Sequence, residues 1–187
     1  MFAATHFRAM ARNDAWSNHR LLKACRELTQ DEFEAKRVSF FPSLQLTLNH
    51  ILLVDWYYLD GLEKGGRGLS IFESEVPFPT LSDLAVAQRA TDARLVRYCD
   101  GLTEEALEEV VTFDRGEHGL HREAVHAVLT HLFVHQIHHR GQAHAMLAGT
   151  RIKPPQLDEF FSIAEAPLRQ AEFAALGWTE ADVWNRA

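Results

Sequence analysis

Two histidines in the last third of the sequence are spaced so that both can bind one metal ion. His135 and His139 are four positions apart. On an α-helix such residues share one face with Cβ atoms about 5–6 Å apart, and imidazole is the commonest protein ligand for metals. A zinc protease would have the same spacing, but Gln136 stands where its catalytic glutamate is required. The pattern therefore favours a metal site and excludes that class of protease.

A third ligand has to come from another helix, and His50 is the candidate. It lies in the middle of the apolar stretch 44–62, where an imidazole without a partner is costly. On a helix antiparallel to the pair, His50 would complete a three-histidine set with an open position, which is typical of catalytic sites. A hydrogen-bonded polar seam without metal fits the same spacing, so both interpretations stay open here. The two cysteines, Cys25 and Cys99, exclude a cysteine-rich site.

Several neighbours of the pair are candidates for supporting roles. His131, one turn before His135, is a candidate outer partner or proton shuttle, and a packing hydrogen-bond donor is the alternative. His138 points away from His135 and suits the surface or an outer contact. Arg140 could hold an anionic substrate or be a solvated charge. The aromatic run 56–58 could line a pocket or belong to the core. No general base is identified.

Four long helices are needed to position these residues. The second is apolar on more than one face, which is typical of a helix central to a bundle or shared with a second subunit. Pro42 can sit in its first turn. Hydrophobic periodicity places the helices at about residues 5–28, 43–62, 82–102 and 123–147.

Shorter elements fill the connections. Residues 63–79 form a long Gly- and Pro-containing surface connection without evident internal structure. Two β-prone pieces, 110–113 and 119–122, flank a turn and predict a small hairpin before the last long helix. A short C-terminal extension is expected to carry helical pieces at about 157–163 and 167–176. The prediction is one all-α domain over residues 1–187.

Composition excludes several classes of protein. The net charge is −7, with 47% hydrophobic and 24% charged residues, and no basic cluster suits nucleic acid. The stretch 44–62 contains Asn49, Asp55 and Asp60, which argue against a membrane span. Cysteines without a CxxC companion favour a reducing compartment. The start of the sequence lacks the apolar run of a signal peptide. A cytoplasmic protein is expected.

Four segments resemble one known family. The run Asn13-Asp-Ala-Trp16-Ser-Asn18 is similar to the N-x-x-W-x-N opening of DinB-like (damage-inducible) proteins, and Leu48-Asn49-His50 resembles their metal-binding histidine on helix two. Residues 131–142 resemble their final-helix signature, and 154–158 the segment that follows it. The resemblance covers about residues 7–161. This sequence departs from it at Val134, where many relatives carry Asn, and at Arg12, where an aromatic is frequent.

The resemblance implies a four-helix bundle in up-down-down-up order, with His50, His135 and His139 binding one divalent metal. Zinc or nickel is expected first, with iron or copper as alternatives. It also implies a homodimer, a small-molecule substrate and a low-molecular-weight thiol as partner. The expected function is metal-dependent transfer of a small thiol to or from an electrophile. The alternatives are a metal-dependent hydrolase of small esters or amides, and a non-catalytic metal-stabilised bundle.

Overall fold

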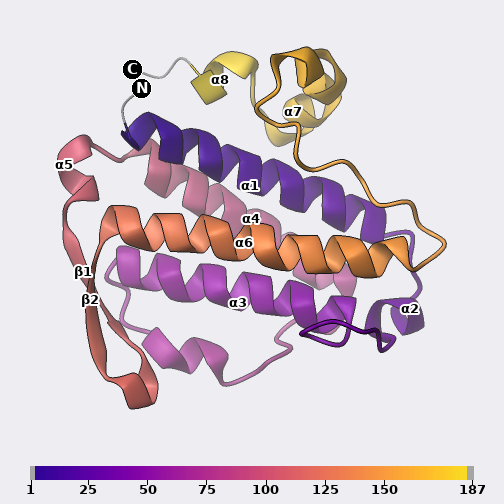
Figure 1. Ribbon diagram of the computed structural model, residues 1–187, viewed down its shortest axis with the longest axis horizontal. Coiled ribbons are helices and arrows are strands. Elements are labelled where there is room, and N and C mark those ends of the chain that lie inside the picture. Colours follow the sequence, from indigo (N-terminus) through magenta and orange to yellow (C-terminus); the bar gives the residue numbers. More distant parts are fainter. Residues whose placement is uncertain (1–2, 185–187) are drawn as a thin grey trace.

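The computed structural model describes residues 3–184 and is a bundle of four long helices (Figure 1). These are α1 (Ala3–Cys25), α3 (Leu44–Leu62), α4 (Leu81–Asp100) and α6 (Val125–Ala148). Helices α1 and α6 run in one direction, and α3 and α4 run in the other (Figure 1). The predicted all-α fold with an up-down-down-up order is therefore confirmed.

The parallel course of α3 and α4 depends on the connection between them. Residues 63–80 return along the length of the bundle, so that α4 starts at the same end as α3 (Figure 1). Within the connection, the 3-10 helix η1 (Gly68–Phe72) packs against α3. The Asp60 carboxylate accepts backbone hydrogen bonds from Arg67 and Gly68 at 2.8 and 3.0 Å. These bonds hold in place a segment that the sequence predicted to be without structure.

Side-chain caps set where two of the long helices begin. The Ser43 hydroxyl accepts a hydrogen bond from the backbone N–H of Leu46, and Thr80 caps α4 in the same way. Pro42 therefore precedes the cap and lies outside α3, not in its first turn as predicted. Between α1 and α3 the chain forms a short helix, α2 (Gln30–Glu34), which the sequence analysis missed although a Thr29–Glu32 capping box marks its start.

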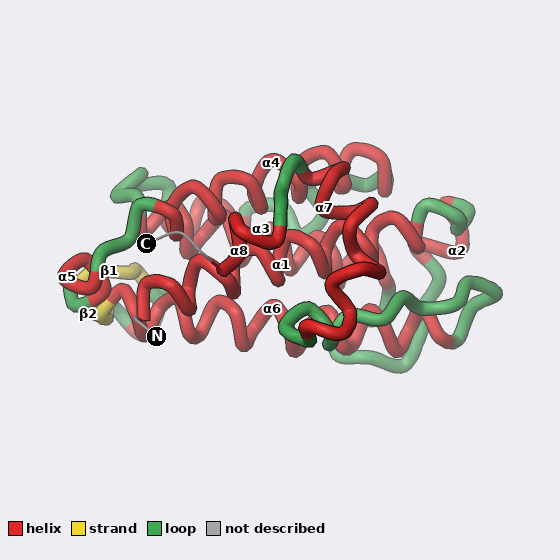
Figure 2. The backbone as a smooth tube through the Cα atoms, turned by 90° about the horizontal axis from the view of Figure 1, so that it is seen from above, coloured by secondary structure: helices red, strands yellow, loops and turns green. Residues whose placement is uncertain are grey.

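The predicted hairpin is present at one end of the bundle, opposite α2 (Figure 2). Strand β1 (Val110–Asp114) pairs antiparallel with β2 (Leu120–Ala124) around the short η2 (Gly116–His118). A one-turn helix, α5 (Glu104–Leu107), leads into it. Phe113 packs against Gly61 of α3, where any side chain larger than hydrogen would collide with its ring. The hairpin is thereby attached to the bundle.

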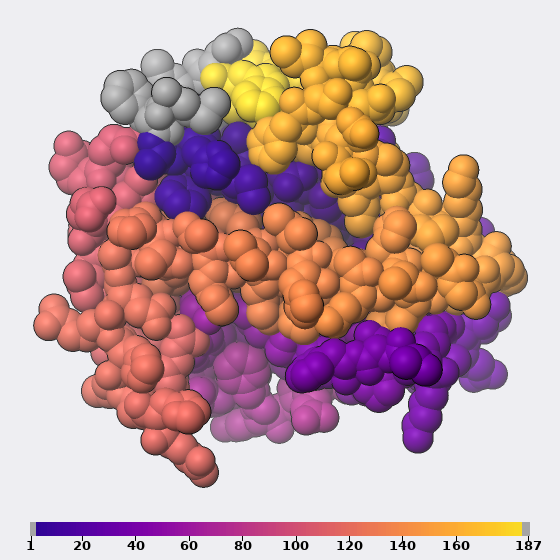
Figure 3. Space-filling model, viewed as in Figure 1, coloured from indigo at the N-terminus to yellow at the C-terminus, as the bar shows by residue number. Residues whose placement is uncertain are grey.

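The C-terminal extension packs on the bundle beside α1 (Figures 1 and 3). It contains η3 (Ile163–Arg169), α7 (Gln170–Leu176) and α8 (Glu180–Trp184). The helical piece predicted at 157–163 is wrong, because residues 157–162 are irregular. Buried Arg169 donates a hydrogen bond to the carbonyl oxygen of Phe160. This carbonyl therefore has a partner without the backbone hydrogen bond that a helix would supply. The piece predicted at 167–176 corresponds to the end of η3 and α7.

Helix α3 is covered on several sides by its own chain. It contacts α4, α6, η1 and β1, and Leu52 and Leu59 on it are fully buried. Its apolar faces therefore no longer argue for a second subunit, and the homodimer stays a prediction. None of the described helices has the length and apolar character needed to cross a membrane.

Candidate metal centre

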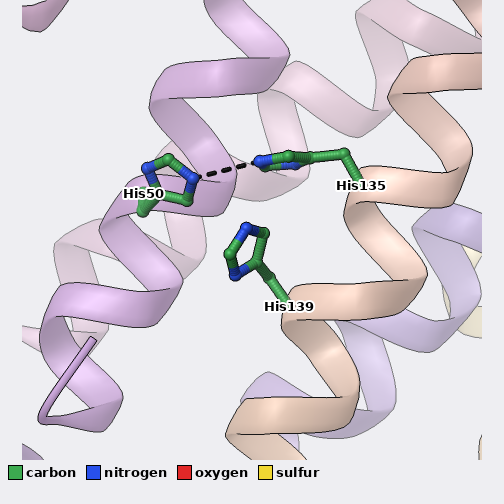
Figure 4. Close-up of side chains that lie close together, drawn as sticks. All are labelled: His50, His135 and His139. Atoms are coloured by element: carbon green, nitrogen blue, oxygen red, sulfur yellow. Dashed lines mark hydrogen bonds between the residues drawn. The ribbon is translucent and has the colours of Figure 1, made fainter. Parts of the chain in front are cut away.

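Three histidines from two helices converge on one point of the bundle. His50 comes from α3, and His135 and His139 come from successive turns of the antiparallel α6 (Figure 4). The Nε2 atoms of His50 and His135 are 3.0 Å apart, and one ring nitrogen of each histidine lies within 4.8 Å of the others. The structure thus brings together all three residues selected from the sequence.

A neighbouring amide orients the His139 ring. Its Nδ1 lies 2.9 Å from Oε1 of Gln142, and because this oxygen only accepts, Nδ1 carries the proton. The Gln142 amide nitrogen donates in turn to Nε2 of His138 at 2.9 Å. The lone pair of His139 is therefore on Nε2, the ring nitrogen directed toward the other two histidines (Figure 4). His138 takes the outer role that its spacing suggested.

Burial keeps the three imidazoles neutral. Desolvation, with His139 nearby, lowers the pKa of His50 to about 4. Desolvation and the surrounding histidines lower the pKa of His135 to about 3. Desolvation also lowers the pKa of His139, although its bond to Gln142 opposes this. At neutral pH each ring therefore offers an unprotonated nitrogen, the form that binds metals.

The donor set fits a divalent ion. Two nitrogens that are each about 2.0–2.1 Å from a tetrahedral ion lie roughly 3.3 Å apart, close to the 3.0 Å between Nε2 of His50 and Nε2 of His135. Nδ1 of His135 is buried and has no hydrogen-bond partner among the described residues. The group could therefore hold one metal ion with a position left open.

The loop before α3 covers the histidines with aromatic rings. Phe41 lies 4.3 Å from His50 and 5.6 Å from His139 between ring centroids, and Phe40 lies 6.4 Å from His139. Figure 3 shows this loop lying against α6. Neither residue is among the candidates predicted from the sequence, although two adjacent aromatics before the helix that carries His50 are a visible signal.

A small cavity of about 180 Å³ opens beside His50. Its walls are mostly apolar, and one carboxylate, that of exposed Glu75, lines it. The other lining residues are Phe41, Leu46, Leu53 and Phe72. The site therefore has room for a small apolar group next to His50.

Other candidates from the sequence lie to one side of this cavity. His131 is exposed, with its ring 6.2 Å from that of His135 and 5.3 Å from that of Tyr58. Trp56 donates to Thr91, and Tyr57 donates to the carbonyl oxygen of Asp114. None of the aromatics at 56–58 lines the cavity beside His50, so they belong to the packing of the bundle.

Helix α6 is also fixed by a buried polar cluster on its inner side. Arg140, directly after His139, is only 4% exposed and forms an ion pair with buried Asp14 of α1. The interpretation of Arg140 as a solvated charge is therefore wrong. Gln136, directly after His135, donates to buried Asp55 of α3. These contacts set the rotation of α6 and thereby aim both histidines at α3.

Asp92 of α4 completes the cluster. Oδ1 of Asp92 accepts hydrogen bonds from Asn18 and Gln88 at 2.9 and 2.8 Å, and Gln88 also donates to Asp55 at 2.8 Å. Burial, together with Asp14, raises the pKa of Asp92 to about 8. Burial and the neighbouring carboxyls also raise the pKa of Asp55 well above its ordinary value.

This cluster predicts that the protein is less stable in mild alkali than in mild acid. Between the ordinary pKa of 3.8 and the folded value of about 8, Asp92 keeps a proton that the unfolded chain releases. Raising the pH through this window therefore lowers the free energy of unfolding, by about 3 kcal/mol between pH 6 and 9. Urea unfolding at both values measures the loss. The loss of unfolding free energy between the two pH values should be smaller in Asp92→Asn. An equal loss in that variant would mean that other titrating groups cause it.

Comparisons with known proteins agree with this architecture. The sequence profile of the DinB family matches residues 1–172. A crystal structure of a DinB-like protein from Bacillus cereus ATCC 10987 superimposes with a TM-score of 0.58 at 19% identity. The superposition covers 75% of this chain and 90% of that one. At 19% identity it shows that the two proteins share a fold. No curated protein matches the chain.

Proposed function

This chain belongs to the DinB family, and on that premise we propose that His50, His135 and His139 bind one divalent metal ion for a reaction of small thiols. The proposed reaction transfers a low-molecular-weight thiol to or from an electrophilic substrate. The observation that carries it is the convergence of three neutral imidazole nitrogens within 4.8 Å, supported by an oriented ring at His139. Zinc and nickel are the first candidates for the ion, and iron or copper the alternatives.

The charge of the site favours thiol activation. An ion held by three neutral imidazoles keeps its full +2 charge and lowers the pKa of a thiol or water molecule that binds it. The two half-buried rings and the 6% exposed His139 limit competition by protons and solvent. Gln142 holds His139 in the required tautomer. Phe41, whose ring lies 4.3 Å from that of His50 at an interplanar angle of 35°, restricts access of water on that side.

The cavity indicates the kind of electrophile. Leu46, Leu53 and Phe72 give it apolar walls, and about 180 Å³ admits only a small group. A compact apolar carbon centre with a leaving group would fit there beside His50. In the transfer the thiol sulfur forms a bond to that carbon, the bond to the leaving group breaks, and the thiol proton passes to solvent.

Hydrolysis is a second candidate because of Glu75. Its carboxylate lines the cavity that also includes His50, and hydrolysis of an ester or amide needs a general base near the attacking water. Glu75 is exposed, and the sequence analysis did not identify it. A product formed from an activated ester without any thiol would favour this reaction.

The main test compares both reactions with and without metal. Protein without an affinity tag is assayed for bound metal and then for conjugation of cysteine or glutathione to benzyl chloride, a compact apolar electrophile, with release of chloride. We expect conjugation only from metal-loaded protein, and no cleavage of 4-nitrophenyl acetate without thiol. If chelation lowers the melting temperature and neither rate is seen, the metal-stabilised bundle without catalysis is the better description.

Loss of the amide at Gln142 should weaken metal binding without removing a ligand. Gln142→Ala leaves Nδ1 of His139 without its acceptor, and loss of such outer partners weakens metal binding by about 10–100-fold. The measurement is competition against a chelating indicator dye. Gln142→Glu keeps an acceptor oxygen and should bind nearly as well as the natural protein. Equal affinities for all three proteins would contradict the orienting role.

A further inference from the structure

A second cavity lies between α1 and α4, whereas the histidines lie between α3 and α6. Its volume is about 300 Å³. The extension closes it on one side with Leu176 of α7 and Trp178, just after α7. Four permanently charged cations line this cavity: Lys23, Arg26, Arg89 and Arg97. We call it the basic cavity.

The basic cavity follows from two helical stripes. On α1 its lining positions are 15, 19, 22, 23 and 26, and on α4 they are 85, 89, 92, 93, 96 and 97. Both sets recur at helical spacing, so each forms one continuous face. Alanines at 15, 85 and 93 leave room between the two helices, while longer cationic side chains extend from the following turns. The cations are therefore gathered by the fold on a chain whose net charge is −7.

The cations at this cavity lack protein counterions. Among the described residues, no carboxylate lies within ion-pair distance of Lys23, Arg26 or Arg97, and Arg89 donates only to the carbonyl oxygen of Ala175. Elsewhere in the chain, arginines such as Arg12, Arg115 and Arg169 are paired with carboxylates. The cavity thus keeps positive charge available for a ligand.

The acidic groups nearest to the basic cavity do not cancel that charge. Glu172 is engaged by Arg20 and by the indole of Trp16, both at 2.8 Å. Asp92 is the one acidic residue in the lining, and burial raises its pKa to about 8, so that it is mostly uncharged at neutral pH. An anion entering the cavity would therefore meet little repulsion.

Apart from His19, whose pKa is lowered mainly by burial, apolar side chains make up the rest of the lining. Leu22 and Val96 are buried on α1 and α4, and the ring of Trp178 is half-buried on the opposite side. A free inorganic anion would leave these surfaces in contact with water. An apolar body joined to an anionic group would cover them and meet the cations at once.

We propose that the basic cavity binds a small organic anion, an apolar body that carries one phosphate or carboxylate group. Its apolar part lies against Trp178 and the walls from α1 and α4, and its anionic group meets Lys23, Arg26 and Arg89. The ligand is a small molecule because the four cations line one cavity of about 300 Å³ and do not form an extended surface. This site is separate from the histidines and does not depend on the reaction proposed for them.

Isothermal titration of the full, metal-loaded chain tests the proposal with four probes. We expect 1-naphthyl phosphate or 1-naphthoate to bind, and the tighter of the two identifies the anionic group. Neutral 1-naphthol lacks the anionic group, and inorganic phosphate lacks the apolar body. Each should therefore bind at least about tenfold more weakly than the better naphthyl anion. Failure of both naphthyl anions to bind would overturn the proposal, as would equal affinity for 1-naphthol.

Variants locate the binding. Lys23→Glu combined with Arg26→Glu alters two exposed side chains. This double variant should bind the tighter naphthyl anion about tenfold or more weakly. Ala93→Trp keeps the charges but fills the mouth of the basic cavity, and should also weaken binding. Arg122→Glu, on an exposed position of β2, and His135→Ala should leave the affinity within about twofold. Loss of binding in His135→Ala would place the probe at the histidines and contradict the assignment.

Discussion

His135→Ala is expected to abolish stoichiometric metal binding while the helical content stays unchanged. His135 is one corner of a triangle of imidazoles, with ring centroids 5.0 Å from His50 and 4.3 Å from His139. Loss of an outer hydrogen-bond partner already weakens metal sites by about 10–100-fold, so loss of one of three ligands should weaken this one by more than about 100-fold. Metal analysis after dialysis and circular dichroism measure the two quantities.

The matched control is His126→Ala on the same helix. His126 is exposed, and its side chain makes no hydrogen bond to any described residue, so its loss should leave one metal ion per chain. His131→Ala separates the remaining candidate, because an outer partner or proton shuttle there would lower activity while metal stays bound. Full metal retention in His135→Ala would show that the three histidines form a polar seam. The bundle would then remain, but the proposed chemistry would not.

Arg140→Met should destabilise the protein by about 3–5 kcal/mol, because it leaves a carboxylate unpaired in the core. Arg140 is 4% exposed and Asp14 is 1% exposed. Arg140 also donates a hydrogen bond to Oδ1 of Asn18 at 3.2 Å. In its absence the charge of Asp14 would face Asp55 and Asp92 without compensation. Chemical denaturation at pH 7 measures the loss.

A second substitution distinguishes the unpaired charge from lost packing. Arg140→Met combined with Asp14→Asn removes both charges, and it should recover a substantial part of the stability. Arg122→Met, an exposed arginine on β2, should change stability by less than about 0.5 kcal/mol. If the double variant is no more stable than Arg140→Met, the ion pair is not the source of the loss.

The sequence was most informative where periodicity and spacing are local properties. The four helices, the hairpin and the pairing of His135 with His139 all follow from patterns within single segments, and the structure agrees with each. It was less informative where capping or tertiary hydrogen bonds determine the backbone. Thr29 starts a short helix inside an apparent break, and Arg169 holds residues 157–162 irregular where a helix was predicted.

Charge and burial were misjudged for the same reason. Arg140 looks solvated in sequence because arginine usually is, and only the arrangement of four helices places Asp14 against it. Glu75 and Phe41 come from loops whose course no periodicity predicts, yet both line the cavity at His50. The basic cavity depends on α1, α4 and the extension meeting, although each stripe is visible in the sequence alone.

By itself, the sequence determined the helical class and the shared face of His135 and His139, because side-chain spacing on a helix is a property of the chain segment. His50 was selected as a candidate third ligand from its place in an apolar segment and from the family resemblance. Only the tertiary structure decided that Nε2 of His50 lies 3.0 Å from that of His135, that Gln142 orients His139, and that four cations surround one cavity. Distances between helices depend on how buried side chains pack and pair across the whole bundle. No single segment contains that information.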